Sequence, residues 1–150
     1  MGSAGRPAER GEREAILHEI LRLERVAGEL RRSTREPITV QTESGPVTIA
    51  AGEVIELQLR RTNSDPAVVG ENPDRLCPGR ALPATVPLVV LSFGDGHHRC
   101  PGGPLAILES DIFLHRLLAR DVVAEGPPRV RWNPVSQGYD LDRFMVRLRG

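Results

Sequence analysis

Residues 93–103 read FGDGHHRCPGG, and this stretch decides how the whole chain is interpreted. Its glycines permit positive φ angles and let the backbone approach a flat or bulky group closely. Cys100 lies directly before an expected helix over 104–120, and the free N–H groups and dipole at a helix N-terminus favour a thiolate over a thiol. A thiolate in a glycine-lined loop is a good ligand for a soft metal ion. His98 and Arg99 add positive charge or hydrogen-bond donors beside it, which suits a carboxylate group.

The same loop resembles the haem-ligand signature of the cytochrome P450 family, whose pattern is F-x-x-G-x-x-x-C-x-G. Phe93, Gly96, Cys100 and Gly102 satisfy that pattern. The resemblance implies haem b as the cofactor, with the thiolate of Cys100 as the iron ligand, where it favours O–O cleavage. It further implies that Phe93 shields the sulfur and that His98 contacts a haem propionate. The expected cofactor-binding residues are Cys100, Phe93, Gly94, His98, Arg31 and Gly102, with Cys100 as the catalytic residue.

A second motif, Glu19-Ile20-Leu21-Arg22, has the form E-x-x-R. Side chains three residues apart are neighbours on a helix. On a helical wheel Glu19 falls inside the apolar arc, so its charge must be paired and hydrogen-bonded. The family carries this motif upstream of the cysteine loop and pairs it with an arginine of the segment called the meander, which matches Arg75. The resemblance therefore implies a structural ion-pair network of Glu19, Arg22 and Arg75 beneath the haem.

Two further segments resemble the family. Arg31 matches a position that pairs with a haem propionate; a solvated arginine fits the sequence equally well, and Arg32 is an alternative for the role. The stretch 63–66, Asn-Ser-Asp-Pro, resembles the A-N-R-D-P segment of the family, with serine in place of arginine.

Other interpretations of the cysteine remain open on the residues alone. Cys100 can be an ordinary free cysteine in a glycine-rich loop. A zinc site would combine Cys100 with His97 or His98, Cys77 and His115, but no paired C-x-x-C spacing supports it. Cys77 matches the meander, where the family does not ligate iron, and His115 is expected to be a packed or boundary residue of its helix.

The hydrophobic pattern predicts an α+β fold, and the resemblance implies that this fold is the C-terminal part of the cytochrome P450 fold. Residues 1–10 are expected to be disordered or left over from cloning, and residues 11–150 to form a haem-thiolate domain. His18 is expected at the surface. The expected elements are a helix over 11–27, a hairpin over 38–49, a short element over 52–57, a long proline-rich segment over 63–87, a helix over 104–120 and strands over 129–132 and 144–148.

Composition narrows the class of protein. The formal net charge is zero, which gives no reason to expect binding to nucleic acid or to an anionic membrane. We find no apolar run long enough to cross a bilayer and no signal peptide, so we expect the protein to be located in the cytoplasm. With only two cysteines, a structural disulfide is not expected there.

The resemblance implies an oxidoreductase of monooxygenase or peroxygenase type, of the soluble bacterial kind. Because only 18 residues precede Glu19, we expect the oxygen-activating helix of the family to be absent and the chain to be truncated. Two alternatives are a non-catalytic accessory protein and a fragment of a full-length monooxygenase. The helix over 104–120 is apolar around most of its circumference, so we expect a homo-oligomer or a second protein chain to cover an exposed apolar face.

Overall fold

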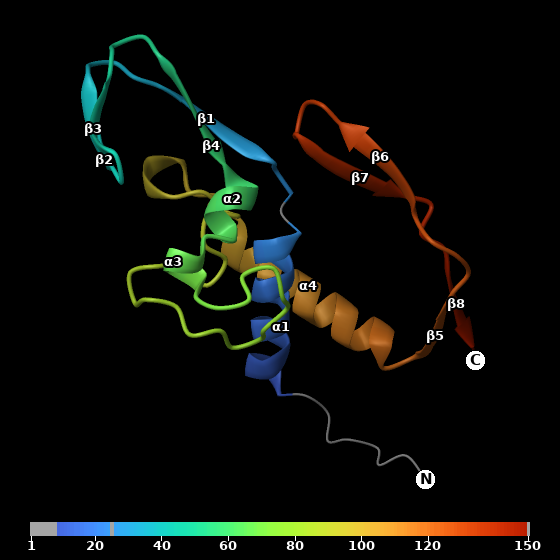
Figure 1. Cartoon of the computed structure of the whole chain (residues 1–150). Coiled ribbons are helices and arrows are strands. Elements are labelled where there is room, and N and C mark those ends of the chain that lie inside the picture. The colour runs from blue at the N-terminus through green and yellow to red at the C-terminus, as the bar shows by residue number, and fades with distance from the viewer. Residues whose placement is uncertain (1–8, 25, 150) are drawn as a thin grey trace.

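The computed structural model describes residues 9–24 and 26–149 (Figure 1). Two longer helices, α1 (Arg10–Leu23) and α4 (Gly103–Leu118), contact each other and form the centre of the molecule. Short helices α2 (Leu59–Asn63) and α3 (Pro66–Val69) lie beside them, and a 3₁₀ turn, η1, covers Gly96–His98. This mixture confirms the α+β prediction. Of the expectation for residues 1–10, residues 1–8 lie outside the described part, and Arg10 already begins α1.

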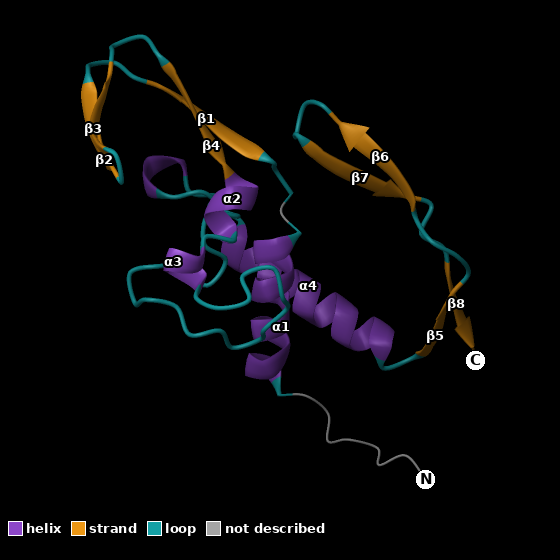
Figure 2. Ribbon diagram, in the orientation of Figure 1, coloured by secondary structure: helices purple, strands orange, loops and turns teal. Residues whose placement is uncertain are grey.

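The strands pair as hairpin-like ribbons that extend away from the two long helices (Figure 2). In the described part of the chain they form four two-stranded antiparallel sheets, with pairs β1–β4, β2–β3, β5–β8 and β6–β7. The strands are β1 (Glu29–Ser33), β2 (Ile38–Thr42), β3 (Gly45–Ile49), β4 (Val54–Gln58), β5 (Asp121–Ala124), β6 (Arg129–Asn133), β7 (Gly138–Asp142) and β8 (Val146–Arg149).

Strand prediction succeeded where apolar residues alternate. The hairpin over 38–49 is confirmed as β2 and β3, with Val40 opposite Val47 in the register. Strand β1 was missed because its sequence, ELRRS, is charged and shows no alternation; it is a strand because β4 pairs with it. The apolar run at Val89–Leu91 forms a turn, in which Val89 and Val90 are buried and Val90 adopts a φ of 51°.

Helix α1 is shorter than expected. It ends at Leu23, whereas the sequence pattern suggested a helix to residue 27, and Val26 is 75% exposed rather than part of an apolar face. The chain leaves the helix because Gly28 has other partners. Its N–H donates to the Ser136 carbonyl (2.9 Å), and its own carbonyl accepts from the Leu59 N–H (3.0 Å).

Helix α4 leaves most of its apolar side chains bare. Its buried residues are Gly103, Ile107 and Asp111, whereas Phe113 is 63% exposed and Leu118 is 70% exposed. A shallow apolar groove of about 560 Å³ runs along this face. Its lining comprises Glu109, Ile112, Phe113, Arg116, Leu117 and Arg120 of α4 and Leu148 of β8.

The apolar core is small for a chain of this length. Among the described residues, those with buried apolar side chains are Leu17, Leu59, Val69, Val89, Val90 and Ile107. The accessible surface is 11585 Å², whereas a compact monomer of 16.5 kDa exposes about 7,600 Å². The molecule therefore carries an excess of exposed surface. Within the described residues, none of the helices combines the length and hydrophobicity that a bilayer crossing requires.

A glycine-to-alanine pair tests how the β6–β7 hairpin docks. A Cβ at Gly28 would lie 2.0 Å from the Gln137 carbonyl oxygen, so the backbone would have to move. We expect Gly28→Ala to lower the free energy of unfolding by about 1–3 kcal/mol, as overpacking does. Urea denaturation measures this. Gly126→Ala is the matched control, because a Cβ there meets nothing within 4 Å, and equal effects of the two substitutions would contradict the docking contact.

Candidate functional site

The loop that carries Cys100 is folded by its own backbone hydrogen bonds. The Cys100 N–H donates to the Phe93 carbonyl (2.8 Å) and closes the loop, while the Arg99 N–H donates to the Gly96 carbonyl (3.1 Å). Gly94 and Gly96 have φ angles of 68° and 62°, in the left-handed region that favours glycine. The turn itself therefore requires glycine at positions 94 and 96.

The ring of Phe93 packs at the start of α4. A Cβ at Gly103 would lie 3.0 Å from a ring carbon of Phe93, so the aromatic ring occupies the place of a side chain there. Cys100 is exposed, and it precedes the first residue of α4 by three positions. The structure thus brings Phe93 and Cys100 together at one helix N-terminus. Gly103 was not singled out from the sequence, although its lack of a side chain is what admits the ring.

His98 and Arg31 are both exposed and differ in how they are held. His98 lies in the 3₁₀ turn of the loop. Arg31 lies on β1 and forms an ion pair with Glu29 at 2.6 Å, with its side chain 63% exposed. Strand β1 borders the loop, because the side chain of Leu30 is 3.8 Å from the position of a Cβ on Gly94.

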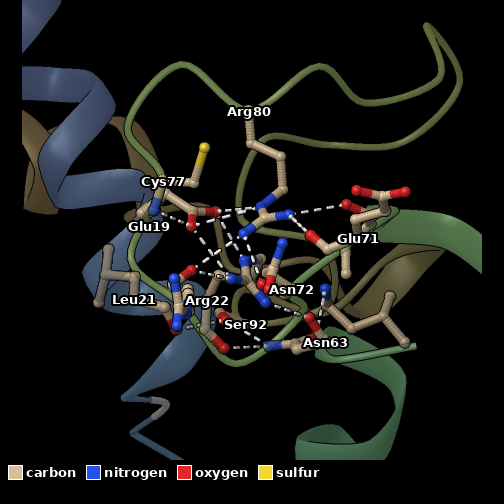
Figure 3. A network of polar contacts seen from close by, with 12 residues as sticks. Glu19, Leu21, Arg22, Asn63, Glu71, Asn72, Cys77, Arg80 and Ser92 are labelled. Atoms are coloured by element: carbon tan, nitrogen blue, oxygen red, sulfur yellow. Dashed lines mark hydrogen bonds and ion pairs between the residues drawn. The ribbon is translucent and has the colours of Figure 1, made fainter. Parts of the chain in front are cut away.

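A buried ion pair joins Glu19 and Arg22, as the E-x-x-R motif predicts (Figure 3). Arg22 Nε donates to Glu19 Oε1 (2.6 Å) and Arg22 Nη2 donates to Glu19 Oε2 (3.0 Å). The side chain of Arg22 is fully buried and that of Glu19 is 4% exposed. Such a pair is tolerated in the interior only when its remaining donors and acceptors are also satisfied.

Those remaining groups connect α1 to the segment before the cysteine loop. Arg22 Nη1 donates to the Asn63 carbonyl (2.7 Å), and the Asn63 amide donates in turn to Ser92 Oγ (2.8 Å). The Ser92 hydroxyl donates to the Leu21 carbonyl (2.7 Å), and the Leu91 N–H donates to Asn63 Oδ1 (3.0 Å). The residue directly before Phe93 is therefore tied to α1 (Figure 3).

The second arginine of the network is Arg80, not Arg75. Arg80 Nε lies 3.4 Å from Glu19, and its side chain is 8% exposed. Arg75 is exposed and contributes its carbonyl, which accepts from Arg80 (2.9 Å) and Arg22 (3.3 Å). Arg80 also donates to the carbonyls of Val69, Glu71 and Asn72, so one guanidinium organises the whole segment. The expectation for Arg75 was wrong for its side chain because the chain folds back at Cys77–Arg80 and brings the later arginine inward.

The charge balance of the network favours an ionised Glu19. Burial raises the pKa of this carboxyl, but the hydrogen bonds from Arg22 and from the Cys77 N–H, with the charges of Arg22 and Arg80, outweigh burial and hold the pKa below its ordinary value. Cys77 itself is exposed and takes part through its backbone.

A second ion pair, absent from the sequence interpretation, links the two long helices. Arg13 of α1 donates to Asp111 of α4 through Nε (2.6 Å) and Nη2 (3.0 Å). Asp111 is 4% exposed, and the hydrogen bonds from Arg13 hold its pKa below the ordinary value. A single aspartate on a mostly apolar helix was the available signal for this contact.

The zinc alternative has no support in the structure. Within residues 9–24 and 26–149, no three side chains of histidine, cysteine, aspartate or glutamate are grouped so that they could hold a metal ion. His115, which was expected to be a packed or boundary residue of its helix, is exposed. His18 is half-buried rather than at the surface, and this burial lowers its pKa.

Comparison with known proteins identifies the family. Residues 13–126 match the Cytochrome P450 family model. The chain is 34% identical over 106 residues to the erythromycin C-12 hydroxylase of Saccharopolyspora erythraea. The aligned region covers 71% of this chain and 25% of that protein. It is 43% identical over 74 residues to the biotin biosynthesis cytochrome P450 of Bacillus subtilis. That aligned region covers 49% of this chain and 17% of the relative. The chain belongs to the cytochrome P450 family.

Solved structures agree with this assignment. The chain matches P450BioI, solved in complex with an acyl carrier protein ligated to hexadec-9Z-enoic acid, with a TM-score of 0.74 and 30% identity over 94% of this chain and 34% of that one. A thermophilic cytochrome P450 from Sulfolobus tokodaii matches with a TM-score of 0.71 and 28% identity, over 94% of this chain and 36% of that one. The chain thus spans about a third of these structures. Membership of the family implies a haem cofactor and relatives of the haem-thiolate monooxygenase type.

The two arginines of the meander give a test of the network. We expect Arg80→Gln to lower the free energy of unfolding by about 3 kcal/mol, because it leaves Glu19 short of one buried partner. We expect Arg75→Gln to change it by less than about 0.5 kcal/mol, because an exposed side chain is removed while the carbonyl remains. Urea denaturation of the two variants compares them directly. A larger loss at Arg75 than at Arg80 would overturn the assignment.

Proposed function

We propose that this chain binds haem and that the thiolate of Cys100 is the iron ligand. The observation that carries the proposal is the placement of an exposed sulfur at the N-terminus of α4, in a loop closed by the Cys100–Phe93 hydrogen bond. As a general rule, a helix N-terminus favours negative charge, which suits a thiolate ligand. Residues 11–150 would then constitute the haem-binding domain, and haem b the form of the cofactor.

The residues around the sulfur fit a flat, bulky group. Gly102 has φ and ψ of −81° and −3°, which any residue can adopt, and a Cβ there would lie 3.9 Å from Cys100 Sγ, an ordinary contact. The fold of the chain itself therefore does not require glycine at 102. Because Gly102 has no side chain, the space beside the sulfur is not filled by this residue. This is consistent with a flat ring system that binds next to the sulfur. Phe93 packs against Gly103 at the start of α4, and we propose that it shields the sulfur once haem is bound.

Charged residues near the loop suit the haem propionates. His98 is exposed in the loop and is free to donate a hydrogen bond to a carboxylate. Arg31 is engaged by Glu29 at 2.6 Å, so its use for a propionate requires that it exchange one carboxylate partner for another. Arg32 donates to the Arg31 carbonyl (2.8 Å) and remains the alternative.

The proposed activity is that of an oxidoreductase of monooxygenase or peroxygenase type. When bound through a thiolate, haem supplies the capacity for O–O bond cleavage. The part proposed for this chain is to present the sulfur of Cys100 at the N-terminus of α4 and to hold its backbone through the loop hydrogen bonds. This chain covers about a third or less of the length of these relatives.

Spectroscopy of two single-cysteine variants tests the proposal. The purified protein is supplied with haemin, reduced and exposed to CO. We expect the red-shifted Soret band of thiolate ligation in the parent protein and in Cys77→Ala, and its loss in Cys100→Ala, because only Cys100 stands in the glycine loop. A colourless parent protein, or a red-shifted band that survives in Cys100→Ala, would refute Cys100 as the ligand.

We also propose that further polypeptide, either a second copy or another protein chain, covers the apolar face of α4. The supporting observations are the exposed apolar groove along α4 and the excess of exposed surface over that of a compact monomer. Light scattering of the purified protein measures its mass. We expect an assembly heavier than the 16.5 kDa chain, whereas a stable monodisperse monomer would speak against this proposal.

A further inference from the structure

The two ends of the cysteine loop are both fastened to the same helix. At the near end, the Ser92 hydroxyl donates to the Leu21 carbonyl of α1 (2.7 Å), one residue before Phe93. At the far end, the loop runs directly into α4, and Asp111 of α4 accepts two hydrogen bonds from Arg13 of α1. Helix α1 therefore spans the base of the loop, with one fastening point near each of its own ends.

The fastening at the far end is a well-defined ionic contact. Its two distances, 2.6 and 3.0 Å, describe a fork-to-fork pairing, which fixes orientation as well as separation. Asp111 is 4% exposed and the side chain of Arg13 is 23% exposed, so the pair is partly shielded from solvent and salt. Asp111 lies eight residues beyond Gly103, about 12 Å along the axis of α4. A rotation or slide of α4 would therefore break the Arg13–Asp111 pair and, at the same time, move the cysteine loop.

We propose that Arg13 and Asp111 are positioning residues for Cys100, which hold α4 against α1 so that the sulfur keeps its place and direction. This inference rests on the proposed function, because it assigns these residues a role in the thiolate ligation of haem. Arg13 acts through Asp111 and α4, in the manner of an outer residue that orients a metal ligand.

The contact can be tested first in the protein without haem. The Cys100 N–H donates to the Phe93 carbonyl, so amide hydrogen exchange at Cys100 reports the order of the loop. We expect exchange at this amide to become about tenfold faster in Arg13→Ala and in Asp111→Asn. Arg10→Gln is the matched control, because it breaks an ion pair on the same helix, Arg10–Glu14 at 2.7 Å, in which Arg10 is 62% exposed.

The second readout is the ligation of added haem. We expect Arg13→Ala to bind haem but to give a smaller share of the red-shifted CO band, with the remainder absorbing as haem without a thiolate. The double charge reversal, Arg13→Asp with Asp111→Arg, should restore both the exchange rate and the red-shifted share, since it rebuilds the pair with opposite polarity. This rescue separates a lost contact from a variant that merely fails to fold.

The outcomes keep the two proposals apart. If the parent protein shows no red-shifted band, the proposed function fails, while the exchange measurement still tests the fastening of the loop. If the parent shows the band, and Arg13→Ala and Asp111→Asn match Arg10→Gln in both band and exchange rate, the positioning role is overturned and haem ligation stands.

Discussion

The pairing of Glu19 with Arg22 inside α1 is the interaction on which the rest of the structure depends. Six apolar side chains are buried in the described residues, too few to order the long irregular segment from residue 70 to residue 95 by hydrophobic contact alone. The ion pair orders this segment, because the donors and acceptors that the pair itself does not use form hydrogen bonds with residues outside α1. Arg22 reaches the Asn63 carbonyl, and Glu19 accepts from the Cys77 N–H and from Arg80. A buried pair of this kind adds little net stability, but it accepts only one arrangement of its partners.

That arrangement explains how a chain rich in proline and glycine presents a sulfur atom reliably. Asn63 and Ser92 pass the constraint from α1 to the residue before the loop, and the loop then closes on itself through Phe93 and Cys100. The thiol is left exposed while its backbone is held. Such a combination suits a ligand that meets a cofactor from outside, since the protein holds the backbone of the cysteine while its side chain stays accessible.

Sequence reasoning recovered the features that are encoded by local patterns and missed those that depend on distant segments. The cysteine loop, the E-x-x-R pair and the hairpin over 38–49 each follow from residues close together in the chain. Arg75 was predicted in place of Arg80 because both arginines lie in the same irregular segment. Only the turn at 77–80 decides which guanidinium points inward. Arg13 and Asp111 are almost a hundred residues apart in the sequence, and no periodic pattern predicts that they pair. The end of α1 was misjudged because Val26 continues the apolar pattern, although the chain there turns to meet the β6–β7 hairpin.

The division of the strands into separate ribbons has a consequence for how the protein behaves in solution. Every strand of a two-stranded ribbon has one side without a neighbour, so unpaired backbone N–H and C=O groups line both margins of each ribbon in the described structure. Isolated ribbons are also only marginally stable in water. On the β6–β7 ribbon, Trp132 and Tyr139 face each other across the two strands, pack edge to face and are both more than half exposed, so this ribbon also carries an exposed aromatic pair on one face. Concentrated solutions are therefore expected to lose material through strand-to-strand addition, starting at these ribbons and not at the helices.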